Sequence, residues 1–302
     1  MAASDFRDLV KPPFANYDVV VYFGCGLFAL PLINHYVVDP TALRFPSFDF
    51  DIGISIAQDA VSILSLLFSV YLLGHIISYC PSLFIEKAIN TFFGKTSSAI
   101  ILSTWSEKKD RPELRDAWRA SRRAKAFRRG RRIQNTVRTV AIAPAIPLVW
   151  MVNYIGGFDF YHSRVPRKVI FQARRKLIKM GYGPAGLNDP WYKILEHYVI
   201  NRYPATTARM YNYLVISGIF RSLSFLFLVC LWFQYYYTLH GLIHGDMPVD
   251  ALLTDSVTVV YQIIAFALLY TVLGFCLASY MKFARRYAEE AIFAFVLADP
   301  TN

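Results

Sequence analysis

Long apolar runs separated by polar segments dominate the hydrophobicity pattern of this chain. Four runs are long enough for a helix to cross a hydrocarbon core about 30 Å thick. They cover residues 19–38, 53–80, 219–239 and 256–280, and the third could begin as early as residue 211. The pattern predicts four transmembrane helices.

The segment between the second and third runs carries most of the positive charge. Residues 81–210 contain 25 of the 32 Lys and Arg residues and only 8 acidic residues, whereas the short loops within the two helix pairs are acidic. Because basic loops stay on the cytoplasmic side of a membrane, we expect both termini and residues 81–210 to be cytoplasmic. The sequence therefore predicts an all-α integral membrane protein, with a helical basic cytoplasmic domain inserted between the second and third transmembrane helices. The predicted divisions are residues 1–80, 81–210 and 211–302.

Two segments of the middle domain are expected to contact the membrane without crossing it. Residues 140–157 are apolar but short, and Pro144 and Pro147 interrupt them. Basic sequence flanks them on both sides, so a full crossing would place one basic flank outside the cell. We expect a re-entrant or buried segment here, and an amphipathic surface helix over residues 83–93.

The second apolar run carries a stripe of polar residues on one helix face. At 100° per residue the stripe covers an arc of about 120°. Its members are Ser55, Asp59, Ser62, Ser65 and Ser69. Small hydroxyl side chains allow helices to pack closely, but a carboxylate within a span usually faces the bundle interior or an aqueous cavity. Pore lining and helix packing both remain open interpretations.

Other ionisable residues near the apolar runs have simpler interpretations. We expect His75 to be an interfacial or hydrogen-bonded histidine, and Arg221 to extend along the helix to the cytoplasmic surface. His240 and His244 lie four residues apart beside Asp246, a spacing that could hold a divalent metal on a helix. The adjacent glycines favour a turn instead, and we predict no metal site.

A cluster of arginines in the middle domain, here called the arginine block, is the clearest candidate for a binding site. It comprises Arg119, Arg122, Arg123, Arg128, Arg129, Arg131, Arg132 and Arg138. Arginine makes bidentate contacts with phosphate, and a basic stripe is typical of nucleic-acid binders. The block could instead hold the domain against anionic lipid, where each basic residue contributes about 1 kcal/mol. Only one lysine lies within the block, and this preference for arginine favours a phosphate ligand.

No sequence motif indicates that the protein is an enzyme. The glycines of residues 181–186 match GxGxxG, but no strand precedes them and no acidic residue follows in a strand–helix unit. The four cysteines lack CxxC spacing and sit in or beside apolar runs, so we expect buried thiols. No catalytic residue and no cofactor is predicted.

In topology and charge, the chain resembles the four-pass membrane effector subunits of bacterial anti-phage systems. The resemblance implies a bacterial inner-membrane protein whose cytoplasmic domain senses a nucleotide or oligonucleotide and whose membrane part forms a pore. Four helices cannot easily enclose a wide channel, so we predict a homo-oligomeric ion channel in the lipid bilayer. The alternative is a membrane-anchored sensor or scaffold that binds nucleic acid or anionic lipid. Either function could involve a cytoplasmic partner protein.

Overall fold

The described part of the chain is helical throughout. The computed structural model describes residues 18–38, 60–87, 136, 139–145, 147–148, 165–181, 191–244 and 256–297, and the structural statements below concern these residues. They contain α-, π- and 3₁₀-helices and no strand. The predicted all-α class is confirmed for this part of the chain.

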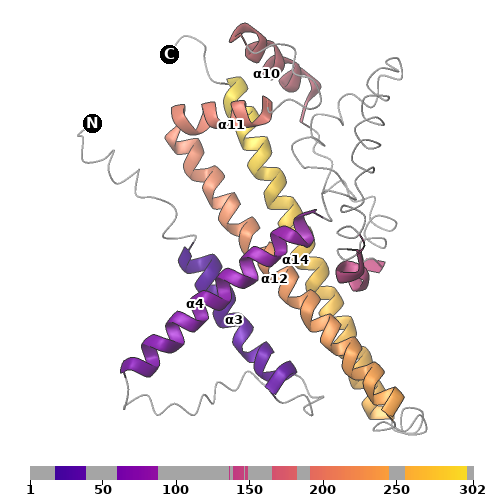
Figure 1. The fold of residues 1–302 in the computed structure, drawn as a ribbon. Helices are drawn as coiled ribbons and strands as arrows, with labels where there is room; N and C mark the ends of the chain where they lie inside the picture. The colour runs from indigo at the N-terminus through magenta and orange to yellow at the C-terminus, as the bar shows by residue number, and fades with distance from the viewer. Residues whose placement is uncertain are drawn as a thin grey trace.

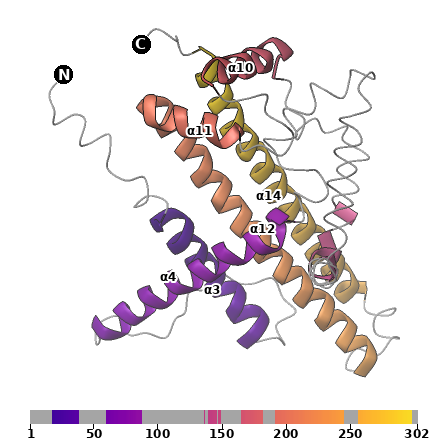
Figure 2. The ribbon, with the colours of Figure 1, turned by 45° about the horizontal axis from the view of Figure 1, so that its top comes forward.

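Two long antiparallel helices form the centre of the structure. They are α12 (Pro204–His244, 41 residues) and α14 (Ser256–Leu297, 42 residues). They lie side by side along their length, as Figures 1 and 2 show. At 1.5 Å per residue each is about 60 Å long, which is twice the thickness of a hydrocarbon core. The hairpin therefore extends well beyond any membrane that it crosses.

Three helical stretches are long and apolar enough to cross a membrane. They are Ile63–Lys87, Pro204–His240 and Val260–Leu297, and they correspond to the second, third and fourth predicted spans. The first predicted span is continuously helical as η1 (Asp18–Phe23), α3 (Gly24–Ile33) and η2 (Asn34–Val38). Its apolar part, Val20–Tyr36, is shorter than the other three. The fourth crossing therefore remains a prediction.

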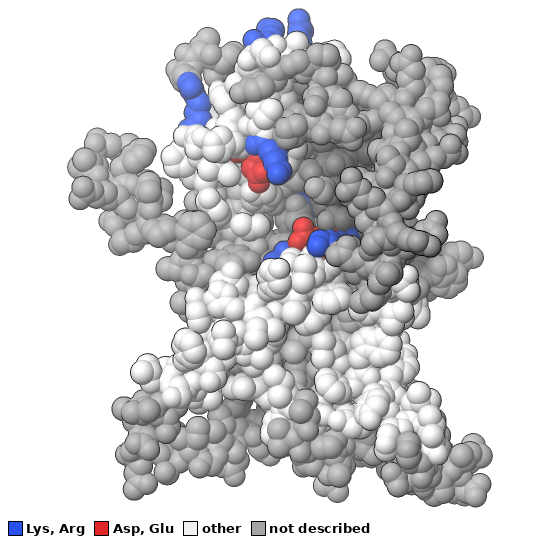
Figure 3. Space-filling view, in the orientation of Figure 1, with Lys and Arg blue, Asp and Glu red and all other residues white. Residues whose placement is uncertain are grey.

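Charge divides the hairpin into two halves. No Asp, Glu, Lys or Arg occurs in residues 222–244 of α12 or residues 256–281 of α14, and we call these two stretches the apolar half. Figure 3 shows the same division on one face, where the charged side chains of the described residues lie only in the upper part. Such a charge-free stretch is what a bilayer core requires.

The other half of the hairpin belongs to a separate packing unit, which we call the distal module. It consists of α10 (Arg167–Lys179), α11 (Trp191–Arg202) and the adjoining ends of α12 and α14, seen at the top of Figure 1. Its buried core is formed by Val165, Ile170, Ala173, Leu177, Leu195, Val199, Met210, Ala288, Ala291, Ile292 and Phe295. Because α12 begins at Pro204, the division predicted between residues 210 and 211 falls inside one continuous helix.

The helix α4 (Ala60–Leu83) crosses both α3 and α12, and forms an X with α3 in Figure 1. Ile77 of α4 packs in one cluster with Cys25 of α3 and Leu226 of α12. The N-terminal part of α4 extends past the crossing, and six of the seven residues 63–69 are exposed. At the other end, residues 83–87, predicted to begin a separate surface helix, continue directly from α4.

The described part of residues 140–157 packs on the hairpin. It includes the short η3 (Ala143–Ala145). Ile142, Ala145 and Leu148 are buried in one cluster with Leu228 of α12 and Leu273 of α14. The segment is thus buried against the hairpin on one side, as one of the two sequence interpretations expected.

Candidate functional site

Two glycines make very close backbone contacts where α4 crosses α3 and the adjoining η1. A Cβ atom built on Gly26 would lie 2.0 Å from the Val70 carbonyl oxygen, and one built on Gly74 would lie 1.7 Å from the Tyr22 carbonyl oxygen. Real Cβ atoms essentially never approach so closely, so only glycine fits at either position. Small residues allow the backbones of membrane helices to approach in this way.

An aromatic group surrounds His75 at this crossing. The imidazole stacks on the Tyr22 ring with 3.8 Å between centroids. It also meets the Tyr71 ring edge to face, with 4.6 Å between centroids. His75 was expected to be interfacial or hydrogen-bonded, and the structure places it in a ring stack between η1 and α4. Because Gly74 lies next to His75, the close backbone contact and the ring stack hold the same two helices together.

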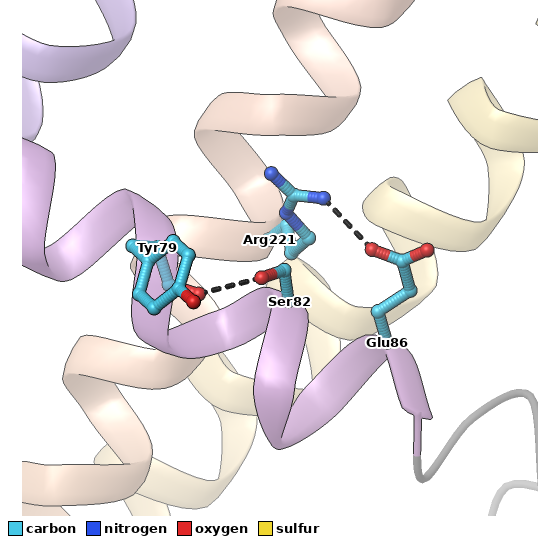
Figure 4. Close-up of polar contacts among 4 residues, drawn as sticks. All are labelled: Tyr79, Ser82, Glu86 and Arg221. Atoms are coloured by element: carbon cyan, nitrogen blue, oxygen red, sulfur yellow. Dashed lines mark hydrogen bonds and ion pairs between the residues drawn. The ribbon is translucent and has the colours of Figure 1, made fainter.

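An ion pair joins the end of α4 to α12. One guanidinium nitrogen of Arg221 lies 3.0 Å from a Glu86 carboxylate oxygen. Figure 4 shows both side chains, with Ser82 one turn earlier on α4 donating a 2.7 Å hydrogen bond to the Tyr79 carbonyl oxygen. The Arg221 side chain is 20% exposed and that of Glu86 is 39% exposed. Arg221 was expected only to extend to the membrane surface, but here it is paired with a carboxylate.

Glu86 was not identified from the sequence. It is the only acidic residue between Asp59 and Glu107, and it follows an apolar run directly. That isolation is a signal that sequence reasoning could have used. A lone carboxylate at the end of an apolar helix usually has a cationic partner, because an uncompensated charge near the bilayer is unfavourable. Its partner lies 135 residues away, and no spacing in the sequence predicts the pair.

Polar side chains also connect the helices inside the apolar half. The Gln234 amide donates a 2.6 Å hydrogen bond to the Gln262 carbonyl oxygen, joining α12 to α14. The Tyr36 hydroxyl donates to the Gln234 carbonyl oxygen at 3.4 Å, and the Tyr237 hydroxyl donates to the Tyr36 backbone oxygen at 2.6 Å. These bonds hold η2 against α12, and they satisfy polar groups for which a bilayer core offers no water.

Ionic and aromatic contacts hold α10 and α11 onto the hairpin. Lys176 of α10 donates a 2.8 Å hydrogen bond to the Phe295 carbonyl oxygen near the end of α14, and its ammonium lies 5.0 Å from the Phe295 ring centroid. A cation is favourable at a helix C-terminus, where carbonyl groups lack helical partners. Arg209 pairs with Glu290 at 3.1 Å, which ties α12 to α14.

A phenol-rich contact joins α11 to α14 in the same module. The Tyr287 hydroxyl donates a short hydrogen bond to a Glu196 carboxylate oxygen. Burial raises the pKa of Tyr192, and the neighbouring Glu196 and Tyr287 raise it further. The Tyr192 phenol therefore stays neutral at physiological pH.

The residues predicted as candidate sites are only partly described. Ser65 and Ser69 are exposed on α4, and the Ser69 hydroxyl donates a 2.8 Å hydrogen bond to the Ser65 carbonyl oxygen. Ser62 lies in the first turn of α4, whereas Ser55 and Asp59 precede the described residues. All eight members of the arginine block also lie outside the described residues. The serine stripe and the arginine block therefore remain predictions.

The described residues contain neither a candidate metal site nor a disulfide bond. No group of three His, Cys, Asp or Glu side chains there could hold a metal ion. Helix α12 continues through residues 241–244, where a turn was expected after His240. Cys25, Cys230 and Cys276 are buried free thiols, and Cys80 is partly buried.

Comparison with known proteins identifies no relative. No protein-family model matches the chain, and neither does any curated protein or any solved structure. The functional argument therefore depends on the residues and geometry of this chain.

Substitution of Gly74 tests the close contact between α4 and η1. Gly74→Ala should destabilise the folded protein by about 1–3 kcal/mol, because the new methyl group collides with the Tyr22 backbone. Gly24→Ala is the matched control, since a Cβ at Gly24 meets nothing within 4 Å. Thermal unfolding of the full chain in detergent measures both variants. Equal stability of the two variants would contradict the close contact.

A double-mutant cycle tests the ion pair between α4 and α12. Glu86→Gln and Arg221→Gln should each lower stability, and the cycle should give a coupling energy of about 1 kcal/mol because the pair is partly exposed. The measurement is the unfolding free energy of the two single variants and the double variant. Strictly additive losses would show that the two side chains do not interact.

Proposed function

We propose that the protein is an oligomeric ion channel or pore-forming effector gated from the cytoplasmic side through the distal module. One observation carries the proposal: α12 and α14 are unbroken helices that run from the distal module into the apolar half. A ligand that shifts α10 or α11 acts on the ends of the same helices that would cross the membrane. The contacts of Lys176 and Arg209 fix those ends to the module.

The proposed topology has four crossings, with both termini and residues 81–210 in the cytoplasm of a bacterial cell and the apolar half in its inner membrane. The helical stretch 18–38 supplies the additional crossing. Its 21 residues span about 30 Å, and Tyr36 and Cys25 pack beside α12 in the same cluster. The distal module, at the basic end of the hairpin, then forms part of the cytoplasmic domain.

A pore requires several copies of the chain. Four helices from one chain do not surround a wide channel, and most oligomers are closed and symmetric. The exposed N-terminal part of α4, with Ser65 and Ser69, is available either to line a shared pore or to pack on another copy. In both alternatives the serine stripe lies where copies of the chain meet.

Reconstitution of the full chain tests the proposal. Purified protein in liposomes should release trapped ions, and its mass in mild detergent should correspond to a closed oligomer. A monomer that releases no ions, with or without cytoplasmic ligands, would reject a channel.

Ser65→Leu tests the role of the stripe within that assay. If this face lines an aqueous path, the bulkier apolar side chain should reduce ion flux several-fold while the oligomer persists. Leu67→Phe is the matched control, because it adds bulk to an exposed residue about 200° further round α4. If Ser65→Leu dissociates the oligomer instead, the stripe packs helices. Unchanged flux with an intact oligomer would exclude both roles.

A second candidate function, a membrane-anchored sensor or scaffold, is favoured by the charge of α10. This helix contains Lys and Arg but no acidic residue, and Lys168, Arg175 and Lys179 are exposed. It packs beside Phe295, which lies 13 residues, or about 20 Å, beyond Lys282 on α14. That distance favours a soluble polyanion over the lipid surface as its ligand. The resemblance to anti-phage effectors likewise suggests an oligonucleotide.

Substitutions in the arginine block separate a polyanion ligand from lipid anchoring. Replacing all eight arginines with glutamine should abolish binding of a short fluorescent oligonucleotide to the full chain. Replacement with lysine should weaken it, because lysine lacks the bidentate fork. Affinity of the unaltered protein should fall steeply with salt, since each neutralised phosphate releases counterions. If no oligonucleotide binds at low salt, only lipid anchoring is left for the block.

A further inference from the structure

Two basic residues of α14 have no carboxylate partner within the part of the chain that the structure describes. The helices α12 and α14 together carry five Lys and Arg residues and two acidic residues. Three of the five form ion pairs, which are Arg209 with Glu290, Arg221 with Glu86 and Arg285 with Glu289. These pairs use both acidic residues of the hairpin. The other two, Lys282 and Arg286, are exposed and available to an anion from outside the chain.

These two cations lie at the level where the charge-free stretch of the hairpin ends. The Phe220 ring of α12 stacks on the Phe283 ring of α14, with 6.0 Å between centroids and 1° between the planes. Each ring is adjacent to the charged residue that ends the charge-free stretch of its helix, so Arg221 and Lys282 lie at about the same level. Arg286 is four residues, or about 6 Å, further along α14. A headgroup layer is about 5–8 Å thick, so it would contain both Lys282 and Arg286.

The two cations continue the exposed apolar stripe of α14. At 100° per residue an arc of about 40° contains Ile264, Leu268, Phe275, Lys282 and Arg286. The three apolar side chains are 46%, 47% and 64% exposed, in that order. Exposed apolar side chains of a membrane helix meet acyl chains, which are as apolar as leucine. The same face of α14 therefore meets acyl chains along its apolar part and lipid headgroups at its charged end.

Aromatic rings connect the apolar stripe to Lys282. The Phe220 ring contacts Phe283 and also meets the Phe275 ring edge to face, with 5.9 Å between centroids. The Lys282 ammonium lies 5.8 Å from the Phe283 ring centroid, and an aromatic face attracts a cation at this distance. The three rings thus form a continuous surface across both helices, with a positive charge at its headgroup end.

This arrangement matches the chemistry of a phospholipid with an anionic headgroup. Arginine can donate two parallel hydrogen bonds to a phosphate, and lysine adds a compact positive charge. Phe275 is seven residues, or about 10 Å, deeper than Lys282. That depth falls within one leaflet, since half of a hydrocarbon core is about 15 Å thick. In the proposed topology the leaflet is cytoplasmic, and its anionic lipids attract juxtamembrane cations.

We propose that Lys282 and Arg286 bind the phosphate of an anionic phospholipid whose acyl chain packs on Phe275. The site rests on the proposed membrane position of the apolar half, and it does not depend on ion conduction. Its occupant is a whole lipid, because the phosphate site and the acyl-chain surface are continuous.

Titration of the full-length protein with lipid in a neutral detergent tests the phosphate site. Phosphatidylglycerol with a fluorescent acyl chain should bind about tenfold more tightly than phosphatidylcholine with the same chain. Substitution of Lys282→Gln together with Arg286→Gln should remove most of this preference. The exchange of Lys282→Arg with Arg286→Lys should keep most of it, because both charges remain. If the exchange variant loses as much preference as the glutamine variant, the assignment of the phosphate to these charges is overturned.

The matched control removes two exposed cations of the same kinds from α11. It combines Lys193→Gln with Arg202→Gln. Arg202 precedes α12, whose first residue is 17 residues, or about 26 Å, from Arg221. This variant should therefore retain the preference for phosphatidylglycerol. An equal loss in the control and in the Lys282 and Arg286 variant would show a general effect of net charge and would overturn the site.

Substitution of Phe275→Ala tests the acyl-chain contact. It should weaken the binding of both lipids by the same factor, because it removes apolar contact area and leaves the charges in place. Phe171→Ala is the control, since this ring is 68% exposed on α10 in the distal module. It should change the affinity for neither lipid. Unchanged affinities in the Phe275 variant would overturn the acyl-chain contact.

Two other outcomes would assign this face to a different occupant. Glycerol 3-phosphate in large molar excess should displace little phosphatidylglycerol, and full displacement would show a site for free phosphate compounds. Dissociation of the oligomer in the Lys282 and Arg286 variant, with the lipid preference unchanged, would show a contact between copies of the chain. A protein that conducts no ions but keeps the lipid preference would retain this site and lose the channel function. Conduction without any lipid preference would reject the site alone.

Discussion

The mismatch between helix length and bilayer thickness organises the whole structure. A hydrocarbon core of about 30 Å accommodates about 20 helical residues, and α12 and α14 are each twice that long. One half of the hairpin is free of charge, and the other half carries the salt bridges and packs with α10 and α11. Both helices run unbroken from one half to the other.

Different forces stabilise the packing within each of the two halves. In the distal module, water is available to the unfolded chain, so burial of side chains such as Leu195 and Phe295 stabilises the packing. In the apolar half lipid would be as apolar as the core, and association depends on close packing and hydrogen bonds. The pairing of Gln234 with Gln262 supplies such a hydrogen bond, and the Gly26 and Gly74 contacts supply close packing between α4 and the N-terminal helices.

Charged and aromatic side chains lie together at the boundary between the two halves of the hairpin. Arg221 and Glu86 lie where the charge-free stretch of α12 ends, and α4 crosses the hairpin at that level. The ion pair allows α4 to end beside α12 without an uncompensated charge near the bilayer. Tyr22, Tyr71 and His75 surround the neighbouring crossing with α3. This level of the structure joins the N-terminal helices to the hairpin.

Hydrophobicity by itself determined that the chain is helical and where its long apolar helices lie, because 20 consecutive apolar residues form a strong local signal. The third and fourth predicted spans lie inside α12 and α14, but the predicted division at residue 210 falls inside α12, because hydropathy changes there and helical structure does not. Only the tertiary structure revealed Glu86 as the partner of Arg221 and the contacts at Gly26 and Gly74. Each of these joins segments that are far apart along the chain. Such contacts depend on how the helices cross, and no local periodicity in the sequence predicts that crossing.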